Sequence, residues 1–190
     1  MRTHILGYPR IGAKRETKKA CENYWSGKIT LEELLETGKQ QRQYNWQIQK
    51  EAGMDWIPVN DFSFYDHILD MTLTVGAIPE RFQALRDLDP NDLYFAMARG
   101  YQQGSHDIIP MEMTKWFDTN YHYLVPEFKK DQDFQYFSDR IIREFREGQA
   151  YGIHAKPVIV GPVSFLLLGK EKEKGFDRLD LIDKLLPVYD

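Results

Sequence analysis

The sequence contains only one cysteine, Cys21, so no disulfide can form within its 190 residues. Such cysteine usage is typical of a reducing compartment, and we expect a cytoplasmic protein. Cys21 lies in a helical pattern without a second cysteine nearby, which favours a small packed residue over a nucleophile or a metal ligand. The five histidines also lack the spacing of zinc ligands, so the sequence predicts no metal site.

Long apolar runs and an excess of positive charge are missing as well. The longest apolar run, residues 158–168, is interrupted by Gly161 and Pro162 and is shorter than the roughly 18 residues that a membrane span needs. Residues 1–5 carry one charge and no long apolar core, which argues against a signal peptide. The net charge of −4 argues against nucleic acid. We therefore expect neither a membrane nor a nucleic acid among the partners.

What is present is an ordinary globular composition, with 42% hydrophobic and 28% charged residues, sufficient for one domain. Four short apolar segments are predicted to be strands: residues 4–8, 56–60, 108–113 and 157–161. Helical patterns lie between them, and this alternation favours a parallel sheet. The Gly-rich phosphate turn of an open doubly wound sheet is absent after the first strand. The predicted fold class is therefore α/β: an incomplete (β/α)8 TIM-type barrel of about four parallel strands with covering helices.

Several helix ends can be predicted from local residues. Thr30 and Glu33 form a capping box, and the helix that follows can run to Ala52, where Gly53 offers a left-handed stop. Three further helices are expected: one capped by Asn91 or Asp92 and ending at Gly100, one from near residue 134 to residue 151 and closed by Gly152, and one after Asp177.

Cations gather directly after the first predicted strand. Residues 7–19 turn on glycines and a proline and then enter a helix, with five Lys or Arg in residues 10–19. A helix start favours anions, so cations there are unfavourable unless a ligand offsets them. Arg15 and Lys18 lie three residues apart and share one helix face. They could hold a phosphate or a row of carboxylates, or form a solvated basic face, and the spacing leaves these alternatives open.

Two other segments follow predicted strands at the rim where barrel enzymes act. In residues 61–67, Asp66 and His67 are adjacent and point differently, which favours rim structure over direct catalysis. In residues 112–123, Lys115 extends toward the same rim as Arg15 and Lys18, unless Glu112 simply neutralises it. His122, between two tyrosines, is interpreted as a packed, hydrogen-bonded imidazole rather than a metal ligand.

These segments together resemble a known family. They are Gly-Tyr-Pro-Arg-Ile-Gly at residues 7–12, Arg-Glu-Thr-Lys at residues 15–18, and residues 61–67, 112–123 and 156–162. They are similar to the amino-terminal barrel of cobalamin-independent methionine synthase, also called 5-methyltetrahydropteroyltriglutamate–homocysteine methyltransferase. The likeness covers nearly the whole chain. It implies that residues 1–190 are the first part of the amino-terminal (β/α)8 barrel, with the rest of that barrel and the catalytic zinc barrel absent.

The resemblance implies a transferase that moves the methyl group of 5-methyltetrahydropteroyltri-L-glutamate to L-homocysteine and makes L-methionine. It places zinc and homocysteine in the missing carboxyl-terminal barrel, so we expect no zinc and no catalytic residue here, and no activity of this chain alone. The family's sites for the folate triglutamate tail fall on Arg15, Glu16, Thr17, Lys18 and Lys115. Thr17 stands where the family usually has leucine, and this one difference does not change the assignment of the tail-binding residues.

Two other functional classes remain open at this point. The chain could be a non-catalytic module that binds polyanions through the same cations, or a structural half-barrel. Half of a barrel would leave strand edges unpaired and expose apolar side chains meant for its interior. A homodimer that covers these surfaces is therefore a possible partnership.

Overall fold

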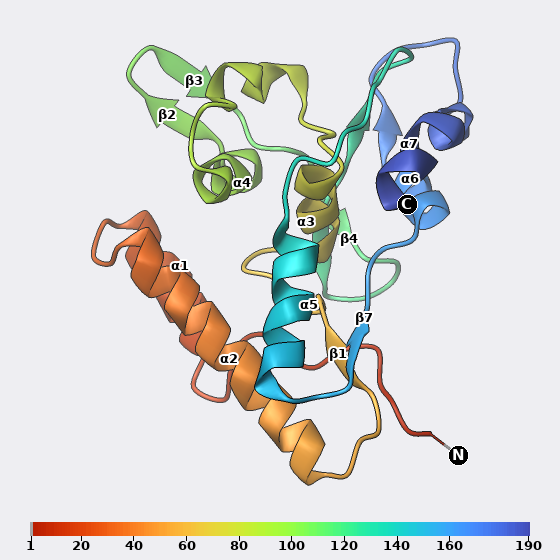
Figure 1. The fold of residues 1–190 in the computed structure, drawn as a ribbon. Coiled ribbons are helices and arrows are strands. Elements are labelled where there is room, and N and C mark those ends of the chain that lie inside the picture. Colours follow the sequence, from red (N-terminus) through yellow and green to blue (C-terminus); the bar gives the residue numbers. More distant parts are fainter. Residues whose placement is uncertain (1) are drawn as a thin grey trace. The chain divides into compact units, whose positions relative to one another are not determined.

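The structure is a computed structural model that describes residues 2–190, so Met1 lies outside the described residues. The chain folds into two compact units (Figure 1). The first unit comprises residues 2–64 and Arg140–Ile159, and the second comprises Tyr65–Asp139 and Val160–Asp190. Each unit is described by itself.

The first unit contains short parallel strands covered by helices. Its helices are α1 (Glu16–Trp25), α2 (Leu31–Glu51) and α5 (Arg140–Tyr151), and its strands are β1 (Ile57–Val59) and β7 (Ala155–Pro157). β1 and β7 pair in parallel, side by side in Figure 1, with Ile57 opposite Ala155. His4 forms a parallel bridge to Trp56. Parallel pairing is therefore present near three of the four predicted strands, but only His4 of residues 4–8 and only Pro157 of residues 157–161 take part.

The core of this unit explains why α2 lies against β1. Trp46, Ile57, Val59 and Ile153 form a buried apolar cluster. The indole Nε1 of Trp46 donates a hydrogen bond of 3.1 Å to the carbonyl of Pro58, so the polar edge of the ring is satisfied although it is buried. Burial of such large side chains, at about 25 cal/mol per Å² of apolar area, is the main force that holds the unit together.

The helix ends of this unit agree largely with the predictions. Thr30 caps α2 in a complete capping box with Glu33, and Gly53 has a left-handed φ of 77°. Gly152, with φ 80°, closes α5 as predicted. The predicted start of α5 near residue 134 is wrong, because α5 begins at Arg140. Residues 134–139 belong to the second unit, where the backbone amides of Gln135 and Phe137 donate to carbonyls at the end of a helix.

The second unit is built from short helices and small two-stranded sheets. Its helices are α3 (His67–Thr74), η1 (Glu80–Leu85), α4 (Pro90–Arg99), α6 (Pro162–Leu168), η2 (Arg178–Leu181) and α7 (Ile182–Tyr189). Its strands are β2 (Tyr101–Gln103), β3 (His106–Ile108), β4 (Met113–Lys115), β5 (His122–Leu124), β6 (Glu127–Phe128) and β8 (Lys170–Glu171). β2–β3 and β4–β5 are antiparallel hairpins, whereas β6 and β8 pair in parallel.

Several predictions for this unit need correction. The strand predicted at residues 108–113 is wrong: β3 ends at Ile108 and β4 begins at Met113. Pro110 in between has no N–H for a ladder, and Met111 instead donates to the carbonyl of Met97 in α4. The cap of α4 is Asp89, followed by a proline at the first helical position, rather than Asn91 or Asp92. The predicted helix end at Gly100 is confirmed.

The fold class is confirmed as mixed α/β, but the described residues do not form a barrel. The fourth predicted strand also lies earlier than expected, at β7 instead of residues 157–161. Pro162 opens α6 at its first helical position, so the chain after β7 leads into a helix. The helix predicted after Asp177 is confirmed as η2 and α7, which bury Leu181 and Leu185. None of the helices described in residues 2–190 is long and apolar enough to cross a membrane.

Candidate ligand-binding loop and hairpin

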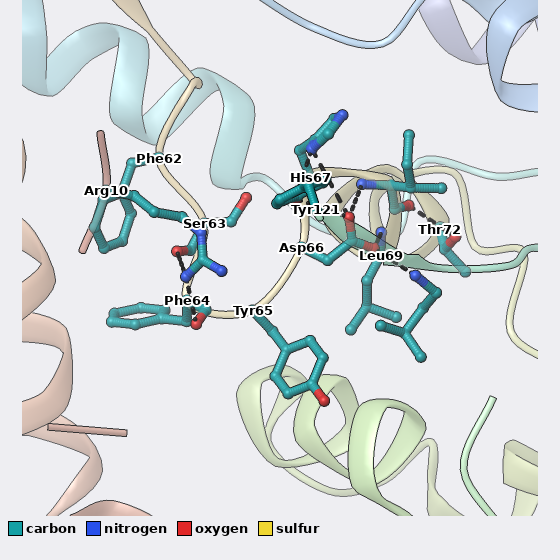
Figure 2. A network of polar contacts seen from close by, with 12 residues as sticks. Arg10, Phe62, Ser63, Phe64, Tyr65, Asp66, His67, Leu69, Thr72 and Tyr121 are labelled. Atoms are coloured by element: carbon teal, nitrogen blue, oxygen red, sulfur yellow. Dashed lines mark hydrogen bonds and ion pairs between the residues drawn. The ribbon is translucent and has the colours of Figure 1, made fainter. Parts of the chain in front are cut away.

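The glycine loop, defined here as residues 7–15 of the first unit, is anchored by residues distant in sequence. The backbone amide of Tyr8 donates to Asp61 Oδ2 at 2.8 Å, and Asn45 of α2 donates to the carbonyl of Pro9 at 3.3 Å. The Arg10 guanidinium donates to the carbonyls of Ser63 and Phe64, each at 3.1 Å, as Figure 2 shows. One of the clustered cations, Arg10, thus fixes the loop.

The end of the glycine loop has unusual backbone conformations. Gly12 has φ 84°, and Arg15, the residue before α1, has φ 63° and makes no side-chain cap bond. The positive φ of Gly12 is one that other residues adopt only with strain, and a Cβ there would also displace the side-chain oxygens of Glu16 and Gln41, so the position favours glycine. A non-glycine residue in the left-handed region costs of order 1–3 kcal/mol and often marks a functional site. Arg15 is such a residue, at the start of a helix.

The four residues of the Arg-Glu-Thr-Lys segment divide into two pairs. Arg15 and Lys18 are exposed, and Lys18 forms an exposed ion pair with Glu22 at 3.6 Å. Thr17 is fully buried, and its hydroxyl donates to the carbonyl of Arg10 at 2.7 Å. Glu16 accepts from the amide of Lys14 at 2.9 Å. The two cations therefore face solvent, while the side chains of Thr17 and Glu16 hold the backbone of the loop.

Backbone hydrogen bonds also set the ionisation of Glu16. Its own amide and that of Lys14 keep the pKa of Glu16 below its ordinary value. Glu16 is therefore an anion next to Arg15 at neutral pH, at the end of α1 where the helix dipole favours negative charge.

Asp61 provides a pH test of the loop anchor. Burial raises the pKa of Asp61 from 3.8 to about 6, although the Tyr8 hydrogen bond opposes this. Between pH 4 and 6 the folded chain therefore holds more protons than the unfolded chain, so this group makes the free energy of unfolding fall as pH rises. Asp61→Asn keeps an acceptor for Tyr8 but cannot titrate. It should remove a slope of up to about 1.4 kcal/mol per pH unit, measured by urea unfolding at several pH values.

A matched control for this test is Asp55→Asn. Hydrogen bonds from Thr3 lower the pKa of Asp55 below 3.8, so above pH 5 this carboxyl is ionised in both the folded and the unfolded chain. The control should leave the slope between pH 5 and 6 unchanged. An unchanged slope in Asp61→Asn would show that this carboxyl does not gain a proton on folding.

In the second unit, Lys115 lies at the end of the β4–β5 hairpin, opposite His122. The turn is closed by the Trp116 amide, which donates to the carbonyl of Tyr121 at 2.7 Å, and it holds Phe117 at φ 51°. Lys115 is exposed and forms no ion pair with any described residue. Glu112 does not neutralise it, because Glu112 pairs with Lys170 at 2.5 Å.

His122 differs partly from its prediction. Its ring is exposed rather than packed. The predicted hydrogen bond is present, between Nδ1 and the carbonyl of Asn120 at 3.0 Å. His122 therefore belongs to the turn that carries Lys115.

Asp66 joins three segments of the second unit. It caps α3 by accepting from the amides of Ile68 at 3.2 Å and Leu69 at 3.0 Å. It also accepts from the amide of Leu124 in β5 at 2.9 Å and from the hydroxyl of Tyr121 at 3.1 Å (Figure 2). Burial raises the pKa of Asp66 to about 6, against the effect of these bonds. These hydrogen bonds give Asp66 a structural role, and its place at the rim of a barrel stays a prediction.

A cavity of about 670 Å³ in the second unit is a weaker candidate for binding a polyanion than the glycine loop and the hairpin. Its lining includes three cations, but they are matched with carboxylates. Arg81 donates to both oxygens of Glu127 at 2.7 and 2.8 Å, Lys172 lies 3.7 Å from the same carboxylate, and Lys129 pairs with Glu80. The exposed cations on the glycine loop and the hairpin are therefore better candidates for binding anions.

The predicted site residues are distributed over both units. Arg15, Glu16, Thr17 and Lys18 lie together at the start of α1, whereas Lys115 belongs to the second unit. That they meet one ligand stays a prediction. The sequence reasoning missed Asn45, the loop anchor on α2, although a signal existed: Gln41, Asn45 and Gln49 recur every four residues, are buried, and both glutamines donate to Asn45. Polar residues on the buried face of a helix indicate partners such as the glycine loop.

Metal ligands are not gathered in the described part of the chain. Within residues 2–190, no group of three or more His, Cys, Asp or Glu side chains is placed to hold a metal ion. Cys21, predicted as a packed residue, is buried at 2% exposure, and burial raises the pKa of its thiol to about 11. At neutral pH this cysteine is a thiol rather than a nucleophilic thiolate.

Comparison with known proteins defines the class of this chain. Residues 2–190 match the family described as "Cobalamin-independent synthase, N-terminal domain", and the chain belongs to this family. The expected family is thus confirmed.

Curated relatives carry a more specific name. The 5-methyltetrahydropteroyltriglutamate–homocysteine methyltransferases of Flavobacterium johnsoniae and Cytophaga hutchinsonii are 63% and 61% identical, over 100% of this chain. That of Nitrosomonas europaea is 56% identical over 98% of the chain. The chain spans about a quarter of the length of these relatives, 24%, 25% and 24% respectively.

Proposed function

We propose that this chain is the amino-terminal part of a methyltransferase that transfers the methyl group of 5-methyltetrahydropteroyltri-L-glutamate to L-homocysteine, making L-methionine. Membership in the synthase family and the names of the relatives support this reaction. The contribution of this chain is to bind the triglutamate tail of the folate. Zinc, homocysteine and the bond-making steps belong to the remainder of the enzyme, which works in the cytoplasm.

The observation that carries the proposed role is the pair of exposed cations on an anchored loop. Arg15 and Lys18 project from the start of α1, while Thr17, Asp61 and Asn45 hold the backbone beneath them. A triglutamate tail presents several carboxylates in a row. Cations held in fixed positions lose little conformational freedom when they bind such a row, which favours affinity. Lys115, exposed and without an ion pair among residues 2–190, adds a third charge for the tail.

We further propose that the parallel segments of the first unit are part of a (β/α)8 barrel. His4, β1 and β7 run in parallel, and α2 and α5 cover them. The glycine loop and residues 60–64 both follow the carboxyl ends of strand segments. In barrels of this type, that end carries the binding site.

A chimaera tests the proposed reaction. In it, this chain replaces the matching quarter of the Flavobacterium johnsoniae methyltransferase, with which it shares 63% identity. The chimaera should form methionine from homocysteine and the triglutamate folate, whereas the isolated chain and the relative without its first quarter should not. Activity of the isolated chain, or an inactive but folded chimaera, would contradict the proposal.

Variants of the chimaera test the tail site. Lys115→Ala, and Arg15→Ala with Lys18→Ala, should raise KM for the triglutamate substrate, by about 1.5- to 5-fold for each charge pair lost. kcat should change little, because these cations do not contact the reacting atoms. The rise should shrink with a monoglutamate folate, which lacks most of the carboxylates. Lys39→Ala removes a surface lysine whose ion pair with Glu36 is 4.0 Å long, and it should leave both KM values unchanged. Equal losses with both substrates would mean that the cations do not hold the tail.

A further inference from the structure

We propose that Tyr121 is a positioning residue that sets the orientation of Lys115 through the β4–β5 turn. This inference rests on the proposed role of Lys115 in binding the folate tail. In addition, contacts of Tyr121 with Asp66 and His67 connect the start of α3 to the hairpin, and we expect them to fix the position of the Lys115 ammonium.

The phenol of Tyr121 is held from two sides. Its hydroxyl lies 3.1 Å from Asp66 Oδ1 and 2.9 Å from His67 Nδ1, as Figure 2 shows. Its ring stacks on the imidazole of His67, with centroids 5.5 Å apart and an angle of 26°. Trp116 packs its edge against the same imidazole, with centroids 5.0 Å apart. The tyrosine therefore has one arrangement in which its hydrogen bonds and its stacking are satisfied together.

The protons of this group can be assigned. A phenol has one proton, and the ionised carboxylate of Asp66 can only accept, so the Tyr121 hydroxyl donates to Asp66. The contact with His67 then requires Nδ1 to carry a proton and to donate to the phenol oxygen. The hydroxyl is thus both a donor and an acceptor, which fixes its rotation as well as its position.

The constraint on the phenol is transmitted to Lys115 along the chain. The carbonyl of Tyr121 accepts from the amide of Trp116, the residue after Lys115, at 2.7 Å. His122, the residue after Tyr121, is the ladder partner of Lys115. Lys115 has no ion pair of its own among the described residues, so its direction depends on this turn. Phe117, with φ 51°, shows that the turn is kept in a conformation that its residues would not adopt unaided.

The test uses Tyr121→Phe in the chimaera, which removes one hydroxyl and keeps the ring. KM for the triglutamate folate should rise by up to the roughly 1.5- to 5-fold expected for Lys115→Ala, with kcat and the monoglutamate KM changed by less than about 1.5-fold. Tyr101→Phe is the matched control, because it removes an exposed phenol that donates to Gln103 in another hairpin of the same unit. His67→Phe, which keeps a ring beside Trp116 but removes the donor to the phenol, should act in the same direction.

A double variant separates this inference from the proposed function. If Tyr121 acts through Lys115, Tyr121→Phe should have no further effect in a Lys115→Ala background. Additive effects, a fall in kcat, equal effects on both substrates, or no effect of Tyr121→Phe would each overturn the positioning role. If Lys115→Ala itself leaves the triglutamate KM unchanged, the proposed tail site fails, and the positioning role fails with it.

Discussion

Asp66→Ala should lower the free energy of unfolding of the second unit by about 2–5 kcal/mol. The side chain is fully buried and accepts hydrogen bonds from Ile68, Leu69, Tyr121 and Leu124. Loss of a helix cap alone costs about 0.5–2 kcal/mol. The amide of Leu124 would in addition be left without an acceptor in the interior, at a cost of about 1–3 kcal/mol. Urea unfolding followed by circular dichroism would measure the change.

Asp89→Ala supplies the comparison for this result. Asp89 also caps a helix, α4, but its carboxylate is exposed and accepts only from Asn91. Its loss should cost no more than an ordinary cap, about 0.5–2 kcal/mol. The difference between the two variants isolates the bonds that Asp66 makes to the hairpin. Equal losses would show that those bonds contribute nothing to stability.

The features that the sequence predicted well depend on neighbouring residues. The capping box of Thr30 and the stops at Gly53 and Gly152 are decided within one turn of a helix, so the local residues suffice. The parallel segments around β1 and β7 were also predicted, because short apolar runs between helices have few other interpretations.

The predictions that failed concern residues whose structure is decided by distant partners. Residues 108–113 are apolar enough for a strand, but Pro110 interrupts the ladder and Met111 bonds to α4 instead. Residues 134–139 continue the pattern of α5 toward the amino terminus, yet their amides bond to the end of α3. Neither partner can be identified from the local pattern.

In the candidate site, too, the features set by neighbouring residues could be predicted, and those set by distant partners could not. The cations at Arg15 and Lys18 are visible in the sequence because five positive residues gather within ten. The anchoring role of Arg10 is not, because it depends on the carbonyls of Ser63 and Phe64, more than fifty residues away. The role of Tyr121 likewise depends on Asp66, which lies 55 residues earlier. Composition thus indicates that a site binds anions, whereas the tertiary structure decides how its charges are held.

Arg42→Ala should lower the free energy of unfolding of the first unit by about 3–5 kcal/mol. The Arg42 Nε and one terminal nitrogen donate to Glu147 Oε2 at 3.0 and 2.6 Å, and another nitrogen lies 3.6 Å from Glu144. All three side chains are mostly buried, with 12%, 17% and 5% exposure for Arg42, Glu147 and Glu144. Arg140 still pairs with Glu144 at 2.8 Å in the variant. Glu147, however, would keep its charge in the interior with no ion pair.

A double variant shows whether the buried charge is the cause. Arg42→Leu with Glu147→Leu removes both charges and keeps apolar volume, so it should cost far less than Arg42→Ala alone. Lys39→Ala on the same helix, with its exposed and long ion pair, should change stability by less than about 0.5 kcal/mol. If the double variant is as unstable as Arg42→Ala, the loss comes from packing of the arginine side chain, including its contact with the Phe62 ring at 5.4 Å, and not from the stranded carboxylate.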